Sequence, residues 1–294
     1  MKIIKNVVIV IAVILASGFL IFATTYNRNS SVGINSHFPS EIDFAGEKTP
    51  SHIYDVRERM DRELLINENL HSSTILILKR ANKAFPIIEP ILAKNNVPDD
   101  FKYLAVIESS LVNAVSAAGA RGVWQFMPET AREKGMEVSE TVDERYHLEK
   151  STEAACKYLL AAKEKFGSWT LAAASYNGGM SGISSQMEFQ QANNYYDLLL
   201  NDETSRYVFR ILALKEIMKN PVLYGFNIPK EELYVNLPTR KIEVDSTIAN
   251  LATFAKAQGI NYKILKYHNP WLRDKKLDNP TKKKYSIEIP IEGY

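Results

Sequence analysis

The carboxylate of Glu108 is the group in this sequence best placed for acid–base chemistry. On a helix, Leu104, Ile107 and Leu111 share its face, so Glu108 would lie among apolar side chains near the carboxyl end of that helix. Burial disfavours the charged form of a carboxyl group and raises its pKa, and the negative end of a helix acts in the same direction. A glutamate that stays protonated near neutral pH can act as a general acid. Periodicity alone, however, favours a structural carboxylate held by hydrogen bonds or an ion pair.

Three further motifs follow the stretch that contains Glu108. Glu108–Ser110, Ala114–Pro128, Ala174–Gly179 and Glu203–Val208 succeed one another within residues 97–221. In this order and at these spacings they resemble the motifs of the lytic transglycosylases, a family of the goose-type lysozyme superfamily. Each motif is modest by itself, whereas four in register are a specific signal. The resemblance reverses the balance for Glu108 and favours a catalytic role.

The resemblance implies a role for residues in each motif. Glu108 would be the catalytic acid and base, and Tyr176 the tyrosine that hydrogen-bonds it. Amide and hydroxyl side chains suit the hydroxyl and acetamide groups of sugars. Ser175 stands where alanine is commoner in the family, which leaves the chemistry intact. The residues that the resemblance places at the substrate are Ser116, Gln125, Met127, Tyr176, Asn177 and Tyr207.

The reaction that the resemblance implies needs one carboxylate, although glycosidases usually use two. We find no convincing second carboxylate in the motifs, since Glu129 and Glu133 fall on a polar helix face. In the family, the glutamate protonates the oxygen between MurNAc and GlcNAc and then takes a proton from the C6 hydroxyl of the MurNAc. The product is a 1,6-anhydro sugar, and neither a metal nor a cofactor is expected.

Two other functions stay open from the sequence. A hydrolase of the goose-lysozyme type would need a carboxylate that positions water. A non-catalytic protein that binds the cell wall is a second alternative, against which the presence of Glu108 argues. The net charge of +2 gives no indication of nucleic-acid binding. The single cysteine, Cys156, cannot form an internal disulfide and is expected to be a buried core residue.

The elements that must position these residues are predicted to be helices from Ser51 to Pro221, with no convincing strand. Trp124 and Phe126 of the second motif are expected in the core. Asp143 and Arg145, downstream of that motif, are expected to form a structural ion pair. The first helix begins near Ser51, and the others are predicted at about 74–83, 86–95, 98–111, 128–135, 151–166, 168–177 and 203–219.

The end of the chain has a different pattern. Residues 240–244 and 285–291 alternate like strands, and residues 246–258 and 262–268 are predicted helices between them. The stretches Ile248–Ala252 and Asn269–Leu272 resemble a divergent LysM domain, a glycan-binding module. The expected fold class is therefore mainly α: an all-helical, lysozyme-like catalytic domain followed by a small α/β module.

The amino terminus is typical of an exported protein. Lys2 and Lys5 precede an apolar run over residues 7–23, close to the lower limit for a membrane-spanning helix. We favour an uncleaved membrane anchor over a cleaved signal peptide, because the segment near Ala23 is a poor cleavage site. The predicted organisation is an anchor at 1–26, a flexible linker at 27–50, a transglycosylase domain at 51–238 and a LysM-like module at 239–294. The expected location is the cell envelope or periplasm, and the expected partners are peptidoglycan glycan strands and the membrane.

Overall fold

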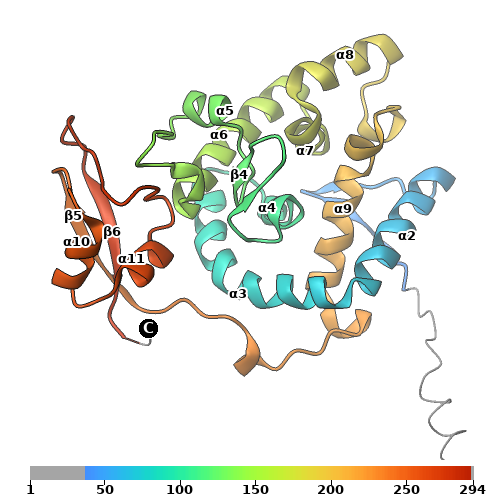
Figure 1. Cartoon of the computed structure of the whole chain (residues 1–294). Helices are drawn as coiled ribbons and strands as arrows, with labels where there is room; N and C mark the ends of the chain where they lie inside the picture. The colour runs from blue at the N-terminus through green and yellow to red at the C-terminus, as the bar shows by residue number, and fades with distance from the viewer. Residues whose placement is uncertain (1–36, 293–294) are drawn as a thin grey trace, which may run out of the picture. The chain divides into compact units, whose positions relative to one another are not determined.

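Helix follows helix over most of the chain, as the apolar spacing predicts (Figure 1). The computed structural model of the protein describes residues 37–292. The predicted anchor at 1–26 lies outside these residues, and none of the helices within 37–292 is long and apolar enough to cross a membrane. The helices of the first domain are α2 (Tyr54–Asn69), α3 (His71–Lys94), α4 (Lys102–Ser109), α5 (Pro128–Glu133), α6 (Leu148–Phe166), α7 (Trp169–Gly178), α8 (Met180–Gln190) and α9 (Asp202–Lys219).

Helix α4 occupies the centre of this domain. All residues from 101 to 107 are buried, and α3 and α9 pack against the helix. In Figure 1, α3 curves around α4 while α9 passes on its other side. The helix that carries Glu108 is therefore held on several sides by the hydrophobic core.

One helix, α3, replaces the two helices predicted at 74–83 and 86–95. It continues through Pro86 and Pro90, although each proline removes a backbone hydrogen bond. Both prolines are exposed, so the carbonyl groups left without a partner can be hydrated. The opposite face carries Ile77, Ala81, Ala84, Ile88 and Leu92, which are all buried. Packing of this face outweighs the cost of the prolines.

A short hairpin lies where the sequence predicted a flexible linker. Strands β1 (Asp43–Phe44) and β2 (Glu47–Lys48) pair antiparallel. The Phe44 ring is fully buried and meets Phe101 edge-on, with ring centroids 5.0 Å apart. The linker prediction for 27–50 is therefore wrong over its last residues, and the compact unit begins at Phe38. The expectation that no strand occurs between Ser51 and Pro221 is wrong at residues 114–115 and 121–122, which pair as two-residue strands too short to give an alternating pattern.

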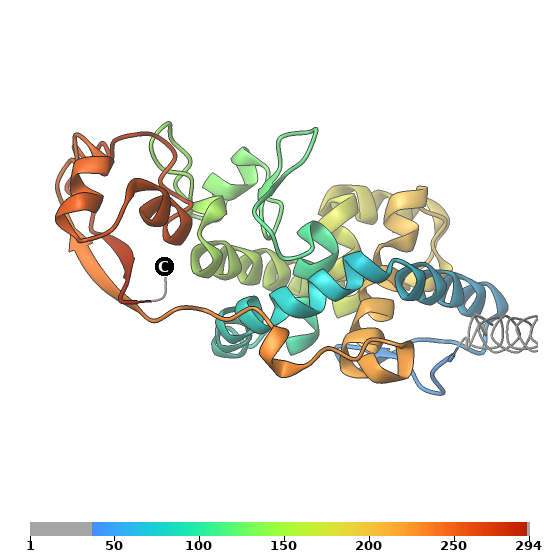
Figure 2. The same cartoon turned by 60° about the horizontal axis from the view of Figure 1, so that its bottom comes forward.

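The carboxyl-terminal module has the predicted order of strand, helix, helix and strand. Its elements are β5 (Thr239–Val244), α10 (Leu251–Ala257), α11 (Tyr262–His268) and β6 (Tyr285–Pro290). The strands pair antiparallel along their whole length, and Figure 2 shows both helices on one side of the pair. Leu251, Leu265 and Ile287 form the core of the module together with Val142 and Tyr146 of the first domain. The fold class expected from the sequence is thus confirmed.

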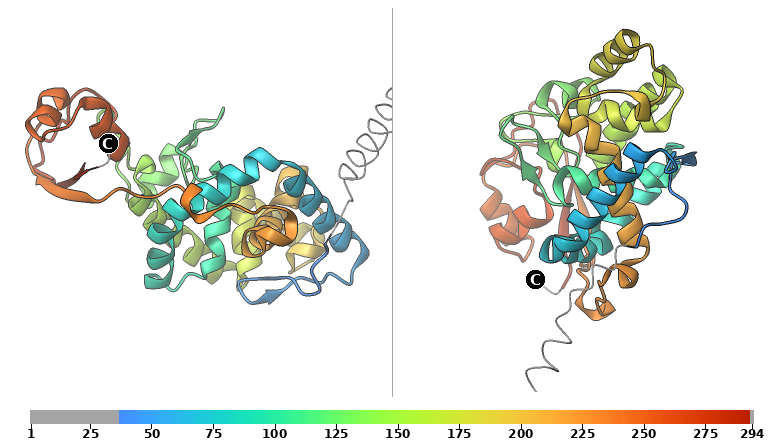
Figure 3. Two further views of the ribbon diagram at one scale, coloured as in Figure 1. Left: turned by 90° about the horizontal axis from the view of Figure 1, so that it is seen from below. Right: turned by 90° about the vertical axis from the view of Figure 1, so that its right-hand side faces the viewer.

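The chain reaches the module through residues 232–237, here called the connecting segment. It runs along α3, as Figure 3 shows. The Tyr234 amide donates to the Lys79 carbonyl at 3.2 Å, and the Asn236 side chain donates to the Lys83 carbonyl at 2.8 Å. These bonds fix the segment against the helix.

Candidate active site

Glu108 lies in the last turn of α4, where the chain changes direction sharply. Ser110 and Leu111 both adopt left-handed conformations, with φ of 53° and 60°. The Ser109 hydroxyl donates to the Val123 carbonyl at 2.8 Å. The end of α4 is therefore tied to the loop of the second motif. The Glu108 side chain is only partly buried, so it remains accessible to solvent.

The partner of Glu108 is Tyr207, not Tyr176. The Tyr207 side chain is buried on α9, and its hydroxyl donates to Glu108 Oε1. The Tyr176 hydroxyl instead donates to the Trp124 carbonyl at 2.8 Å, and its ring packs edge-on against Phe126. The expectation that Tyr176 bonds the glutamate is therefore wrong. Because α9 packs directly on α4, a tyrosine of α9 reaches the carboxylate first.

The environment of Glu108 makes it a group that titrates near neutral pH. Burial raises its pKa from 4.5 to about 7. The hydrogen bond from Tyr207 and the charge of Arg210 oppose this rise, while the charge of Glu203 adds to it. Arg210 is held by a hydrogen bond from Nη2 to the Ile107 carbonyl at 3.3 Å. The raised pKa that we expected from the apolar helix face is confirmed, and Glu108 can donate a proton at pH 7.

Glu203 is a residue of this site that the sequence reasoning missed. It lies exposed in the first turn of α9, and its Oε1 accepts a hydrogen bond of 2.9 Å from the Asn177 amide. The Asn177 oxygen in turn accepts from the Thr204 hydroxyl at 2.7 Å. The signal was in the sequence, because Glu203 precedes Tyr207 by four residues and so shares its helix face.

The other predicted substrate residues lie on a small hairpin. Strand β3 (Ala114–Val115) pairs with β4 (Arg121–Gly122). Ser116 Oγ accepts from the Ala120 amide at 3.0 Å and closes the turn. Gln125, with φ of 49°, donates from Nε2 to the carbonyls of Ala114 and Gly122 at 3.1 and 2.7 Å. Met127 is 39% exposed. Contact of these residues with a sugar stays a prediction.

Arg145 supports the same hairpin through hydrogen bonds to backbone carbonyls. Its guanidinium forms a buried, two-bonded ion pair with Asp143 at 2.8 and 2.9 Å and donates to the carbonyls of Gly119 and Phe126. The predicted structural ion pair is thus confirmed. Gly122 packs so closely here that a Cβ would lie 1.9 Å from the Arg145 oxygen, which only glycine avoids.

The remaining expectations about side chains concern the core and the surface. Trp124 is fully buried and donates from Nε1 to the Thr152 hydroxyl at 2.8 Å, and Phe126 is also buried, as predicted. Cys156 is buried, which raises the pKa of its thiol to about 12. Glu129 and Glu133 are exposed. Within residues 37–292, no cluster of His, Cys, Asp or Glu could hold a metal ion.

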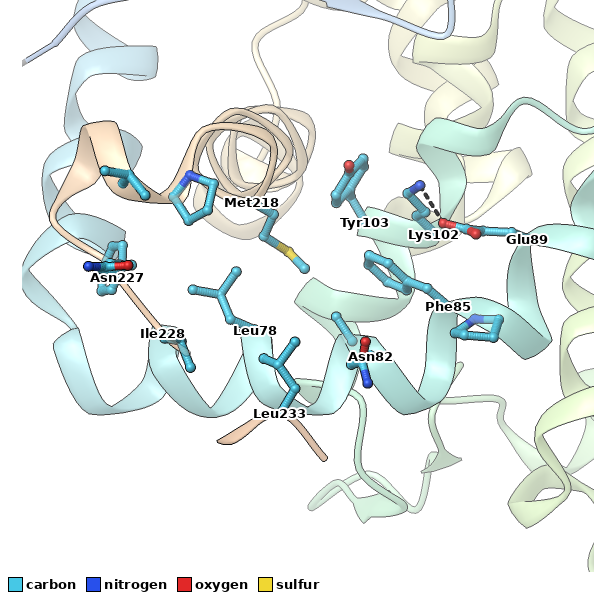
Figure 4. A pocket seen from close by; sticks show the side chains of 15 residues that line it. Leu78, Asn82, Phe85, Glu89, Lys102, Tyr103, Met218, Asn227, Ile228 and Leu233 are labelled. Atoms are coloured by element: carbon cyan, nitrogen blue, oxygen red, sulfur yellow. Dashed lines mark hydrogen bonds and ion pairs between the residues drawn. The ribbon is translucent and has the colours of Figure 1, made fainter. Parts of the chain in front are cut away.

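A cavity of about 500 Å³ lies between α3 and the end of α9 (Figure 4). Leu78, Phe85 and Met218 give it apolar walls, and the Lys102–Glu89 ion pair of 2.7 Å lies at one end. Glu108 and the predicted substrate residues are not among its lining residues. This cavity is therefore separate from the candidate active site.

Comparison with known proteins agrees with the motifs. Residues 85–199 match the family described as "Transglycosylase SLT domain", and residues 240–293 match "Soluble lytic transglycosylase C-terminal LysM-like domain". Membrane-bound lytic murein transglycosylase D of Escherichia coli K12 is 30% identical over 220 residues, 73% of this chain and 47% of the relative. The same protein of E. coli O6:H1 matches equally well.

The chain spans about half the length of these curated relatives. Within the lytic transglycosylases, the form of the stretch Trp124–Pro128 together with Asp143–Arg145 favours transglycosylase D, and the comparison agrees. Glu108, the β3–β4 hairpin and Tyr176 all fall inside the first matched range. The chain thus contains a transglycosylase SLT domain, followed by a LysM-like domain of the soluble lytic transglycosylase type.

Proposed function

We propose that the protein is a peptidoglycan lytic transglycosylase that cleaves the MurNAc-β-1,4-GlcNAc bond without water. The observation that carries this proposal is Glu108, a glutamate with a pKa of about 7 at the end of a buried helix, bonded by Tyr207. A protonated glutamate suits the first step of glycosidic cleavage, and the same carboxylate suits the second.

In the proposed reaction Glu108 gives its proton to the glycosidic oxygen as the bond from that oxygen to C1 of MurNAc breaks. The resulting carboxylate then takes the proton of the C6 hydroxyl on the same sugar, and the C6 oxygen bonds to C1. The product is 1,6-anhydro-MurNAc, and Glu108 ends protonated as it began. Tyr207 would stabilise the carboxylate between the steps, since its hydroxyl donates to Oε1.

One observation favours a hydrolase as the second candidate. Glu203 lies near enough to Glu108 to raise its pKa, and it is exposed to solvent, so it could position a water molecule. Mass spectrometry of the muropeptide products separates the two functions. Anhydro-MurNAc ends support the transglycosylase, whereas new reducing ends from the wild-type protein would support the hydrolase.

The same experiment with Glu203→Gln assigns the second carboxylate. A transglycosylase should keep anhydro products in this variant, while a hydrolase should lose its reducing-end products. Glu108→Gln serves as the negative control for both. Unchanged wall degradation by Glu108→Gln would contradict the role of Glu108 in both enzymatic candidates. A wild-type chain that binds peptidoglycan without degrading it would instead indicate a non-catalytic wall-binding protein.

We further propose that the chain acts in the cell envelope, anchored by residues 1–26. The relatives are named as membrane-bound, and the apolar run at 7–23 supports an export signal. Fractionation of cells that produce the full chain tests this. Recovery in the membrane fraction supports the anchor, whereas a soluble protein with a shortened amino terminus supports a cleaved signal peptide.

A further inference from the structure

A second, larger groove lies between the helical domain and the carboxyl-terminal module. Its volume is about 1120 Å³. One wall is α3 with the connecting segment, and the opposite wall is α11. The third wall is formed by residues 111–113, directly after the end of α4. Asn113 follows Glu108 by five residues, so their Cα atoms are at most about 19 Å apart.

Three polar side chains of this groove lack the partners that such groups usually have. Arg80 and Lys83, on α3, have no carboxylate within ion-pair distance among residues 37–292; they contact the Ser110 carbonyl and the Tyr267 hydroxyl. His268 Nε2 is buried and has no hydrogen-bond partner in the described part of the chain. A buried polar atom without a partner is costly unless a ligand or water satisfies it.

The two carboxylates of the groove do not neutralise these groups. Glu149 and Glu288 both lie close to Lys241, at 3.7 and 3.6 Å. The cations of α3 are therefore available to an anion from outside the protein. An ammonium and a guanidinium are the usual partners of a carboxylate.

Aromatic groups in the groove are less suited to stacking on a sugar. Trp271 is buried between His147 and Tyr285, with ring centroids 6.0 and 5.6 Å away. Tyr267 is exposed, but Lys83 lies over its ring, 5.4 Å from the centroid. Of these two rings, the exposed one is therefore already in contact with a cation of α3.

We propose that this groove binds a carboxylate of the peptide stem of peptidoglycan, through Lys83 and His268. This inference rests on the proposed function, because it takes peptidoglycan as the substrate. The groove adds a site for the peptide beside the site at Glu108 for the glycan. Arg80 donates to the Ser110 carbonyl at 3.2 Å and so lies beside the end of α4.

The test compares soluble glycan strands that carry peptide stems with strands from which an amidase has removed them. In the full chain, Lys83→Met combined with His268→Leu should raise KM for the peptide-bearing strands about tenfold, with kcat unchanged. KM for the peptide-free strands should stay the same. Lys83→Glu should raise KM further, because it repels a carboxylate. Lys256→Met, an exposed lysine on α10, is the matched control and should match the wild type.

Two results would overturn the inference. The first is an equal loss on both kinds of strand, which indicates a glycan contact or a structural role. The second is an unchanged KM in all groove variants. Calorimetry with the free stem peptide and with its carboxyl-terminal amide gives a readout independent of activity: the wild-type chain should bind the peptide more tightly than the amide, and the double variant should bind both weakly. If the wild-type chain were inactive but still bound the peptide, the proposed function would be rejected and the inference that the groove binds the peptide would stand.

Discussion

At the scale of single residues, Glu108 should reduce the stability of the protein while it enables the reaction. Its pKa rises from 4.5 to about 7, so the folded state holds this proton more tightly than the unfolded chain. The associated stability is present below pH 4.5 and is lost as the pH rises through 7. One pKa unit corresponds to about 1.36 kcal/mol, so ionisation of Glu108 costs up to ~3 kcal/mol above pH 7.

Glu108→Gln should therefore be inactive and more stable. We expect activity on peptidoglycan to fall by about 10²–10⁴-fold, the usual contribution of a general acid. Urea unfolding at pH 8 should show a free energy of unfolding higher by up to ~3 kcal/mol, and at pH 4 a difference near zero. Glu129→Gln, an exposed glutamate, is the control. A variant that is less stable than the wild type at pH 8 would contradict the burial argument.

Tyr207→Phe should shift the pH dependence of activity. The Tyr207 hydroxyl stabilises the charged form of Glu108 and so lowers its pKa. Without this donor the pKa of Glu108 rises, and the fall in kcat/KM on the alkaline side moves above pH 7. Tyr176→Phe removes a hydroxyl that donates to a carbonyl instead and should leave the position of that fall unchanged. A shift in Tyr176→Phe but not in Tyr207→Phe would instead support the expectation from the sequence that Tyr176 hydrogen-bonds Glu108.

The sequence could locate Glu108 but not its partner, and the reason is geometric. The apolar spacing around Glu108 predicts which face of its own helix is buried. The choice between Tyr176 and Tyr207 depends on which of two distant helices packs on α4, and no local pattern records that. Arg145 and Asp143 were predictable as a pair, because they are neighbours in the chain.

At the scale of elements, local periodicity predicted most helices but not the features that distant contacts decide. Helix α3 persists through two prolines because its buried face is continuous. The β1–β2 hairpin forms in a polar stretch because its side chains contact residues of the helical domain. Lys215 of α9, for example, donates to the Asp43 carboxylate at 3.2 Å, and the Phe44 ring packs edge-on against Phe101. Neither contact can be seen in a window of the sequence.

Glu47 shows what the hairpin contributes to the fold. Its carboxylate accepts hydrogen bonds from the amides of Trp169 and Thr170 at 2.6 and 2.9 Å, at the amino terminus of α7. Burial alone would raise its pKa, but these bonds, with those from the hydroxyls of Thr170 and Ser168, lower it below 4.5. A carboxylate supplied by β2 therefore caps the helix that carries Tyr176 and Asn177.

Glu47→Gln should lower the free energy of unfolding by about 1–2 kcal/mol at pH 7, the usual contribution of a charged cap. Because the pKa of Glu47 is lowered in the fold, its contribution is present above pH 4.5 and is lost as the pH falls through the lower, folded value. Urea unfolding at pH 7 and pH 3 measures both parts. Glu41→Gln, an exposed neighbour, is the control. An equal deficit at both pH values would mean that the charge of Glu47 is not involved.

At the scale of the whole described chain, the module and the helical domain share structural groups. The Asp143 amide donates to the Trp271 carbonyl at 2.9 Å, while the Asp143 carboxylate holds Arg145. Lys283 of the module lies 2.7 Å from Glu137 and 3.0 Å from Glu144. The segment of residues 137–145 thus contacts both the β3–β4 hairpin and the module.

Trp271 contacts residues of both parts. It is 4% exposed and stacks against His147 of the helical domain and Tyr285 of the module. Trp271→Ala should lower the free energy of unfolding by about 3–5 kcal/mol, because it leaves a cavity in a core that contains residues of both parts. Calorimetry should show one transition for the wild-type chain and an earlier, separate transition of the module in the variant.

The control for this variant is Tyr262→Ala, which removes a more exposed aromatic ring from α11. If Trp271→Ala lowered the melting temperature no more than Tyr262→Ala does, the shared core would not couple the two parts. Activity on peptide-free strands gives a second measurement. Because Asp143 holds Arg145, and Arg145 holds the carbonyls of Gly119 and Phe126, loosening the module should also lower kcat. A LysM-like module that only added affinity for the wall would change KM and leave kcat as it is.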